Sequence, residues 1–173
     1  HKSGRPRVNN NIELKNRKYD IFFSGQLNGE RIECVDALDK IKGKYNSFIN
    51  LTNIFAGGLK LQKYYDMMCN SKISIVPRGV SIDESFRFFE SFLSNCITIT
   101  TLDFKSPKFD KIWYYKNCPA IILDNWNKLN EGVIDRALSL ISYYETENKK
   151  YYDDHISPLA VAEYIKNKII QND

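Results

Sequence analysis

Short apolar runs and stretches of helical periodicity alternate along this chain, and the alternation constrains the fold more than any other feature. The apolar runs predict strands at residues 19–25, 46–52, 72–77, 96–100 and 119–123. Helical spacing predicts helices at residues 29–45, 127–144 and 157–170, a loop and helix over residues 57–71, and a Phe-rich helix between the third and fourth strands. Strict alternation is typical of a parallel sheet with helices on both faces. We therefore expect an α/β fold: one Rossmann-like, doubly wound parallel sheet in a single domain.

The two ends of the chain differ in their patterns. Residues 1–17 are polar and rich in Asn, Arg and Lys, which predicts a linker or tail before a domain that spans residues 18–173. The last predicted helix has a start signal, because Ser157 is a favourable N-cap and Pro158 suits a first turn.

Composition narrows the classes of ligand. The apolar fraction is 43%, the charged fraction is 27% and the net charge is +4. This charge is too small to predict nucleic-acid binding, but it suits an anionic small ligand. No run approaches the roughly 18 apolar residues of a membrane helix, and there is no signal-peptide pattern.

The four cysteines do not form a motif. They are widely spaced and include no C-x-x-C pair, so neither a zinc site nor a redox motif is indicated. Cys34, Cys69 and Cys96 fall within helix or strand patterns, and we expect them to be small core residues.

Polar residues follow each predicted strand. In open α/β sheets ligands bind outside the carboxyl ends of the strands, where helix N-termini favour negative charge. Small residues, hydroxyls and one arginine at this edge predict a phosphorylated ligand. The residues at the five strand ends are Ser24, Gly25, Gln26, Thr52, Asn53, Gly57, Gly58, Arg78, Gly79, Ser81, Thr100, Thr101, Asp103, Asp124, Asn125 and Trp126.

The Phe-rich helix holds three polar residues, Ser85, Arg87 and Glu90. Its rings fall on more than one side, so we expect burial around much of its circumference, and a charge there needs a partner. Arg87 and Glu90 could form an ordinary helical ion pair, or the partner could be a ligand. Residues 81–84 match the capping box S-x-x-E.

The run PRGVSIDESFRFFESFLSNCITIT resembles the nucleotide-sugar-binding half of exostosin-like (GT47-type) glycosyltransferases. The matching motifs are P-x-G at residues 77–79, S-x-R-x-x-E at residues 85–90, and Cys96-Ile97. The upstream YYDMMCNSKISIVPRG and the downstream Asp124–Trp126 pair are also similar, so the resemblance covers residues 19–129. The family's Gly-Cys-Ile-Pro is Asn-Cys-Ile-Thr here, at residues 95–98.

The resemblance implies the donor-binding domain of a GT-B enzyme that transfers a sugar from a nucleotide-diphosphate sugar to a glycan or other hydroxyl acceptor. A UDP-sugar is the favoured donor, and neither a cofactor nor a metal is implied. Glu90 would accept hydrogen bonds from the ribose, and Arg87 or Arg78 would face the diphosphate. The remaining implied contacts are to phosphate from Ser24, Gly25 and Ser85, and to the base from the loop around Thr52, Asn53 and Ile54; Gly79 belongs to the P-x-G motif.

The general base would come from a second Rossmann-like domain, in the same or another chain, so the catalytic residues are not identified in this chain. The helix at residues 158–170 would cross back to that domain. Because the chain begins with His and one such domain is half a GT-B enzyme, we expect a fragment. The implied compartment is the cytoplasm in a bacterial or viral setting, or the Golgi lumen in a eukaryote.

Two other interpretations stay open. One is a non-catalytic module that binds a nucleotide or a sugar phosphate, and the other is an α/β interaction domain without a ligand. A dehydrogenase is disfavoured because SGQLNG lacks the pattern G-x-G-x-x-G. A serine hydrolase is disfavoured because G-x-S-x-G is absent and neither His1 nor His155 is suitably placed.

Overall fold

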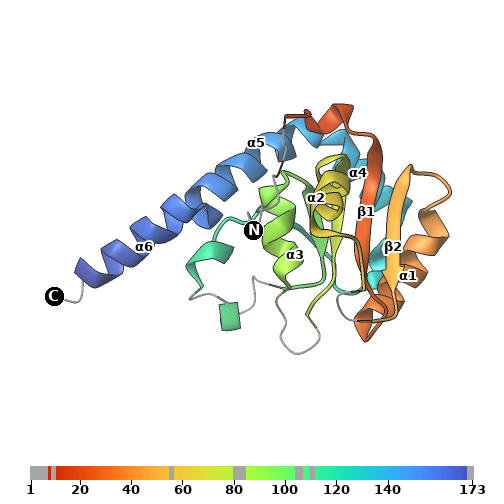
Figure 1. The fold of residues 1–173 in the computed structure, drawn as a ribbon, viewed down its shortest axis with the longest axis horizontal. Helices are drawn as coiled ribbons and strands as arrows, with labels where there is room; N and C mark the ends of the chain where they lie inside the picture. The colour runs from red at the N-terminus through yellow and green to blue at the C-terminus, as the bar shows by residue number, and fades with distance from the viewer. Residues whose placement is uncertain are drawn as a thin grey trace, which may run out of the picture.

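The domain is built around five parallel strands in the order β2-β1-β3-β4-β5 (Figure 1). The computed structural model describes residues 8, 11–54, 57–79, 85–103, 107–109 and 112–170. The strands are β1 (Tyr19–Gln26), β2 (Ser47–Thr52), β3 (Ser71–Val76), β4 (Ile97–Thr100) and β5 (Ile121–Ile122). The predicted α/β class with a doubly wound parallel sheet is confirmed, since every strand pair is parallel.

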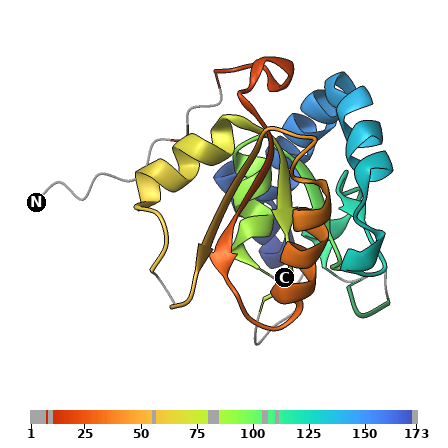
Figure 2. The same cartoon turned by 90° about the vertical axis from the view of Figure 1, so that its right-hand side faces the viewer.

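Helices cover both faces of this sheet, as Figure 2 shows for the orange α1 and the yellow α2. The helices are α1 (Glu30–Ile41), α2 (Leu61–Cys69), α3 (Phe86–Leu93), α4 (Glu131–Ser139), α5 (Ile141–Tyr151) and α6 (Pro158–Ile170). The short elements are η1 (Leu14–Asn16), η2 (Pro107–Phe109), η3 (Trp113–Tyr115), η4 (Trp126–Lys128) and the π-helical η5 (Tyr152–Ile156). α1 and α4 share one hydrophobic core, whereas α2 and α3 pack on the other side.

Alternating side chains of the strands supply both cores. Ile73 and Ile75 of β3 pack in the main core with residues of α1 and α4, while Val76 packs with α3. In β1, Phe23 joins the main core, whereas Phe22 packs against Met68 of α2. Successive strand residues point to opposite faces, so a strand that is apolar at nearly every position needs cover on both sides.

Seven of the eight residues of α3 are buried or partly buried, as predicted, and Phe86 is the exception within this helix. Phe88 and Phe92 are buried with Val76 and Tyr151, but Phe86 keeps 86% of its surface exposed. At 3.6 residues per turn, Phe86 and Phe88 project about 200° apart, so both rings cannot face the sheet. The helix therefore has an outer side, and its polar residues are not forced into the core by their neighbours.

The predicted tail over residues 1–17 extends too far. Leu14 is fully buried in the main core, and its backbone N–H donates to Glu145 Oε1 at 2.7 Å. Arg17 is buried as well, and its Nη1 donates to the Ser71 carbonyl at 2.9 Å. Residues 14–17 therefore belong to the packed domain, because Leu14, an apolar side chain in a polar stretch, packs in the main core.

The single helix predicted over residues 127–144 is also wrong. Residues 126–128 form η4, and α4 begins only after Asn130, whose Oδ1 accepts the Val133 N–H at 3.2 Å. α4 ends at Leu140, where φ is −103° and ψ is 22°, and α5 follows directly. α5 then packs against the amino ends of the strands, where Asn148 Nδ2 donates to the Cys96 carbonyl at 2.7 Å. The apolar periodicity of the sequence continues across these breaks, so it predicted one helix where the structure has η4, α4 and α5.

The last helix and the cysteines agree with prediction. Ser157 caps α6, since its Oγ accepts the Ala160 N–H at 3.2 Å. α6 extends away from the sheet (Figure 1), and its Tyr164 ring stacks on Trp113 at 4.4 Å. Cys34, Cys69 and Cys96 are buried, and no disulfide joins any of the four cysteines. In the described residues, no helix combines the length and apolarity needed to cross a membrane.

We predict that Phe88→Ala lowers the free energy of unfolding by about 3–5 kcal/mol, because it leaves a cavity in a closed cluster. The matched change Phe86→Ala should alter it by no more than about 0.5 kcal/mol, because that ring is exposed. Urea unfolding followed by circular dichroism measures both. Equal losses in the two variants would contradict this packing of α3.

Candidate functional site

The strand order creates a topological switch point at one edge of the sheet. β1 lies between β2 and β3, so the chain leaves β1 toward α1 on one face and leaves β3 toward α3 on the other. Where the connections diverge in this way, an open α/β sheet has its usual ligand position, outside the carboxyl ends of the strands. The candidate site is therefore the end of β1 and β3, which includes Gly25 and Arg78.

Arg87 lies across the end of β1. Its Nε donates to the Ser24 carbonyl at 2.8 Å, although the two residues are 63 positions apart. A Cβ at Gly25 would lie 3.0 Å from Arg87 Nη2 and 3.4 Å from the Phe23 ring. Gly25 is therefore the residue that lets the guanidinium approach the strand so closely. The structure brings together the predicted residues Ser24, Gly25 and Arg87.

The two predicted serines have partners within the protein. Ser85 is the N-cap of α3, and its Oγ accepts the Arg87 N–H at 3.4 Å. The Ser24 Oγ accepts a hydrogen bond from Asn50 Nδ2 at 3.1 Å. Residues 81–84, the predicted capping box, lie outside the described residues. The structure thus assigns the cap of α3 to Ser85, a residue that the sequence had suggested only as a phosphate contact.

Glu90 does not pair with Arg87 but lies between α3 and α2. Its Oε2 accepts the Tyr64 hydroxyl at 2.8 Å, and its Oε1 accepts the Tyr65 hydroxyl at 3.2 Å. Burial, together with the nearby Glu90 charge, raises the pKa of Tyr64 well above its usual range and that of Tyr65 to about 12. The tyrosines therefore stay protonated donors at neutral pH and hold the carboxylate in one orientation.

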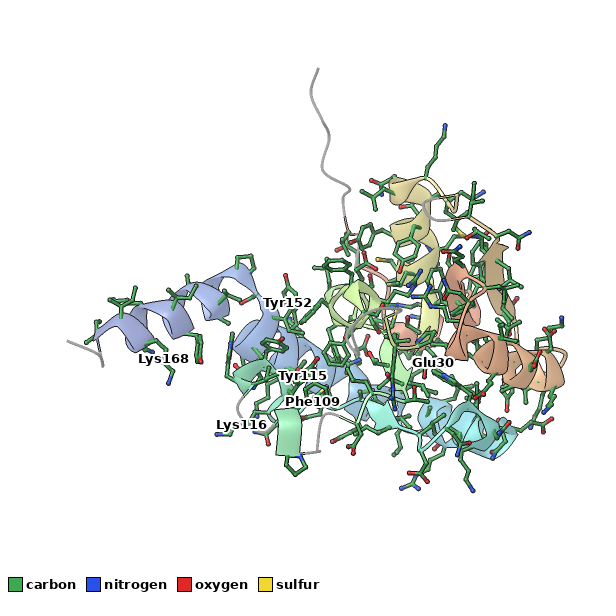
Figure 3. The ribbon with its side chains drawn as sticks, turned by 90° about the horizontal axis from the view of Figure 1, so that it is seen from below. Glu30, Phe109, Tyr115, Lys116, Tyr152 and Lys168 are labelled. Carbon is green, nitrogen blue, oxygen red and sulfur yellow. The ribbon has the colours of Figure 1, made fainter. Side chains whose placement is uncertain are left out.

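Arg78 belongs to a second group of contacts on the same edge. Its backbone N–H donates to the Glu30 carboxylate, its Nη2 donates to the Thr101 carbonyl at 2.8 Å, and its Nε lies 3.7 Å from Glu30 Oε2. The Thr101 hydroxyl also donates to Glu30, at 3.2 Å. Glu30, at the start of α1 (Figure 3), thus joins the ends of β3 and β4 and balances the Arg78 charge.

Arg31 lies at the start of α1, shortly after β1 in the chain, and it was not among the predicted site residues. It is the second residue of α1, only 8% of its surface is exposed, and it lies near enough to Arg87 for the two charges to interact. Burial and then the Arg87 charge lower the pKa of Arg31. The one signal in the sequence was a cation in a first helical turn, where the helix dipole disfavours positive charge.

The loop after β2 lies beside the end of β1. The Leu27 N–H donates to the Thr52 carbonyl at 3.1 Å, and Gln26 Nε2 donates to the Asn53 carbonyl at 3.2 Å. The Thr52 hydroxyl donates to the Ile54 carbonyl at 3.2 Å. These polar residues therefore border the candidate site from the β2 side. On the β3 side, Gly79 is partly exposed next to Arg78.

The end of β5, the strand farthest from β1 on that side of the sheet, contributes fewer residues to the ligand edge than predicted. Trp126 is buried in the main core with α1 and α4, so it is a packing residue rather than part of the ligand edge. Asp124 and Asn125 are exposed, and Asn125 Oδ1 accepts the Asn127 N–H at 3.1 Å. The polar edge was predicted at all five strand ends, but in the structure it consists of the ends of β1, β2, β3 and β4.

Within the described part of the chain, no three His, Cys, Asp or Glu residues group closely enough to hold a metal ion. His155 lies in η5, with its ring 5.8 Å from Trp113 and 5.1 Å from Tyr151. A scan of protein-family models finds none that matches this chain, and a search of curated proteins finds no match either. What the site does must therefore be inferred from its geometry.

We predict that Tyr65→Phe makes stability less dependent on pH in alkaline solution. Because the folded pKa of Tyr65 is raised from 10.0 to about 12, the unfolded chain loses this proton first, and stability falls as pH rises through that window. The variant should show a shallower fall than the wild type when urea unfolding is repeated across these pH values. The control Tyr143→Phe removes an exposed ring hydroxyl and should keep the wild-type slope; equal slopes in all three proteins would contradict the assignment.

Proposed function

We propose that this chain is the donor-binding domain of an exostosin-like GT-B glycosyltransferase, which transfers a sugar from a nucleotide-diphosphate sugar to a glycan or other hydroxyl acceptor. The observation that carries the proposal is the contact of Arg87 with the end of β1. The arginine of the S-x-R-x-x-E run lies within 2.8 Å of the Ser24 carbonyl, beside a glycine that leaves it room. This is the switch point of the sheet, where ligands of doubly wound folds bind.

Arg87 is suited to the leaving group of such a transfer. When the sugar moves to its acceptor, negative charge develops on the departing nucleoside diphosphate, and a fixed guanidinium stabilises that charge. The Nε of Arg87 is used by the Ser24 carbonyl, which orients the side chain. Its two terminal nitrogens have no acceptor among the described residues, so they are available for phosphate oxygens in a bidentate arrangement.

Glu90 is suited to the ribose. An ionised carboxylate has about four lone-pair positions, and the hydroxyls of Tyr64 and Tyr65 use two of them. The remaining positions can accept hydrogen bonds from two vicinal hydroxyls. Because both tyrosines donate to it, the carboxylate is already oriented before a ligand arrives, which lowers the entropy cost of binding.

α6 supports the expectation of a second domain. It extends from the body of the molecule, and its exposed apolar residues include Leu159, Ile165 and Ile169. Exposed apolar surface of this kind marks an interaction site. We propose that this helix packs against a second Rossmann-like domain that supplies the general base and binds the acceptor. The Arg87 and Glu90 positions then bind and orient the donor, with no metal or cofactor required of them.

We predict that Arg87→Met and Glu90→Gln each weaken binding of UDP or of a UDP-sugar by about 1–3 kcal/mol, as expected for hydrogen bonds to charged groups. Calorimetry of the folded chain against UDP, GDP and UDP-GlcNAc measures this. Arg136→Met and Glu163→Gln are matched controls, because both residues are exposed and lie on α4 and α6, outside the strand-end cluster of Arg87 and Glu90; they should bind as the wild type does. Unchanged affinity in both site variants would contradict the proposal.

If the chain is instead a non-catalytic nucleotide-binding module, the same variants should lose binding. Transfer of the sugar must therefore be measured separately. Release of UDP from the UDP-sugar in the presence of a hydroxyl acceptor, with the whole protein, distinguishes the two. Binding of a nucleoside diphosphate without any turnover would favour the module.

A further inference from the structure

The two arginines that follow β3 in the chain have different partners at the ligand edge. Arg87 reaches the end of β1, where its Nε donates to the Ser24 carbonyl at 2.8 Å, and no carboxylate of the described residues forms an ion pair with it. Arg78 reaches the end of β4, where its Nη2 donates to the Thr101 carbonyl at 2.8 Å. Its Nε lies 3.7 Å from Glu30 Oε2, which is an ion-pair distance. One guanidinium is therefore balanced by a carboxylate, and the other is not.

Several contacts hold the Glu30 carboxylate beside Arg78. It accepts hydrogen bonds from the Arg78 backbone N–H and, at 3.2 Å, from the Thr101 hydroxyl. Glu30 is also the first residue of α1, where the helix dipole favours a negative charge. Hydrogen bonds to an ionised acceptor are stronger than those between neutral groups. The carboxylate therefore has a fixed position beside the Arg78 guanidinium in the free protein.

The strand ends next to the two arginines are neighbours. β1 and β3 pair directly, with Phe22 opposite Ser74, and adjacent strands lie about 4.8 Å apart. Arg78 follows β3, and its side chain keeps 39% of its surface exposed. If Glu30 lost its charge, the Arg78 guanidinium could therefore act on an anion that is bound at Arg87.

We propose that Glu30 is a specificity-determining residue that neutralises Arg78, so that the ligand edge offers a diphosphate one unbalanced guanidinium, that of Arg87. This inference rests on the proposed function and deepens it, because it decides between the two arginines that the sequence offered for the diphosphate. Glu30 itself lies in none of the sequence motifs. Since the attraction of a diphosphate grows with each unbalanced cation, Glu30 limits how tightly the departing nucleoside diphosphate is held and favours its release.

The variant Glu30→Gln tests the charge of this residue. Its amide oxygen can still accept a hydrogen bond from the Arg78 N–H or the Thr101 hydroxyl. We expect it to bind pyrophosphate and UDP about threefold or more tightly than the wild type at low ionic strength, because Arg78 is no longer neutralised. The gain should shrink as salt is added, and affinity for uncharged uridine should not change. Calorimetry of the whole folded chain measures each affinity.

Arg78 shows whether the gain comes from its charge. Arg78→Met alone should keep UDP affinity within about twofold of the wild-type value, because this charge is already balanced. In the Glu30→Gln background the same change should abolish the gain. Glu163→Gln is the matched control, because it removes an exposed carboxylate on α6 and should bind as the wild type does.

A merely structural role for Glu30 predicts a different pattern, in which Glu30→Gln lowers the Tm and leaves the affinity for anions unchanged or lower. That result would overturn the proposal, as would a gain that persists after Arg78→Met or a wild type that binds neither pyrophosphate nor UDP. If Glu30→Gln does not fold, Arg78→Met carries the test. A loss of about tenfold or more in its UDP affinity would show that Arg78 binds the diphosphate itself, and this too would overturn the proposal.

The role of Glu30 and the donor role fail in different ways. Pyrophosphate that binds more tightly to Glu30→Gln, without tighter binding of any nucleoside diphosphate or sugar nucleotide, would support the charge effect of Glu30 and refute the donor role. UDP-sugar binding that depends on Arg87 and Glu90, but is not strengthened by Glu30→Gln, would support the donor role and refute the one proposed for Glu30.

Discussion

Burial of β3 on both faces is the constraint on which the rest of the structure depends. Ile73, Ile75 and Val76 are all buried, with cores on two sides of the same strand. A parallel strand of this kind cannot face water, so helices must cover each side. The chain meets that requirement by sending α1 to one face and α2 and α3 to the other. The divergence of these connections at the ends of β1 and β3 creates the candidate site.

The candidate site gathers charge that the fold itself does not require. Arg31, Arg78 and Arg87 come from three different segments near the carboxyl ends of parallel strands, where Arg87 bonds the Ser24 carbonyl and Arg78 pairs with Glu30. Packing explains Phe88 and Phe92 of α3 and the tyrosines of α2, but it does not explain a buried arginine at a helix N-terminus. Residues that break local rules while the rest of a domain obeys them mark a functional site. The arginines at the end of β1 are the residues here that fit this description.

The sequence predicted the elements that have strong local signals. Apolar runs such as KISIV are short, β-branched and bounded by a proline, and all five predicted strands exist within one or two residues of their expected limits. Helix periodicity was reliable where a cap or a proline marked the end, as at Ser157 and Pro158. It failed at Leu140, where no residue in the sequence signals the change of backbone angle that separates α4 from α5. A periodic pattern reports which residues are apolar, and it does not report where the axis of the helix turns.

The sequence by itself determined the class of fold, the parallel sheet and the edge at which polar residues collect, because these depend on the spacing of apolar residues along the chain. The tertiary structure alone decided which side chains meet. Trp126 is buried in the core, whereas Phe86 is exposed. Glu90 accepts hydrogen bonds from Tyr64 and Tyr65 and does not pair with Arg87. Arg87 reached the Ser24 carbonyl at the end of β1 although 63 positions separate them. Contacts between distant segments depend on how helices pack against a shared sheet, and no local pattern carries that information.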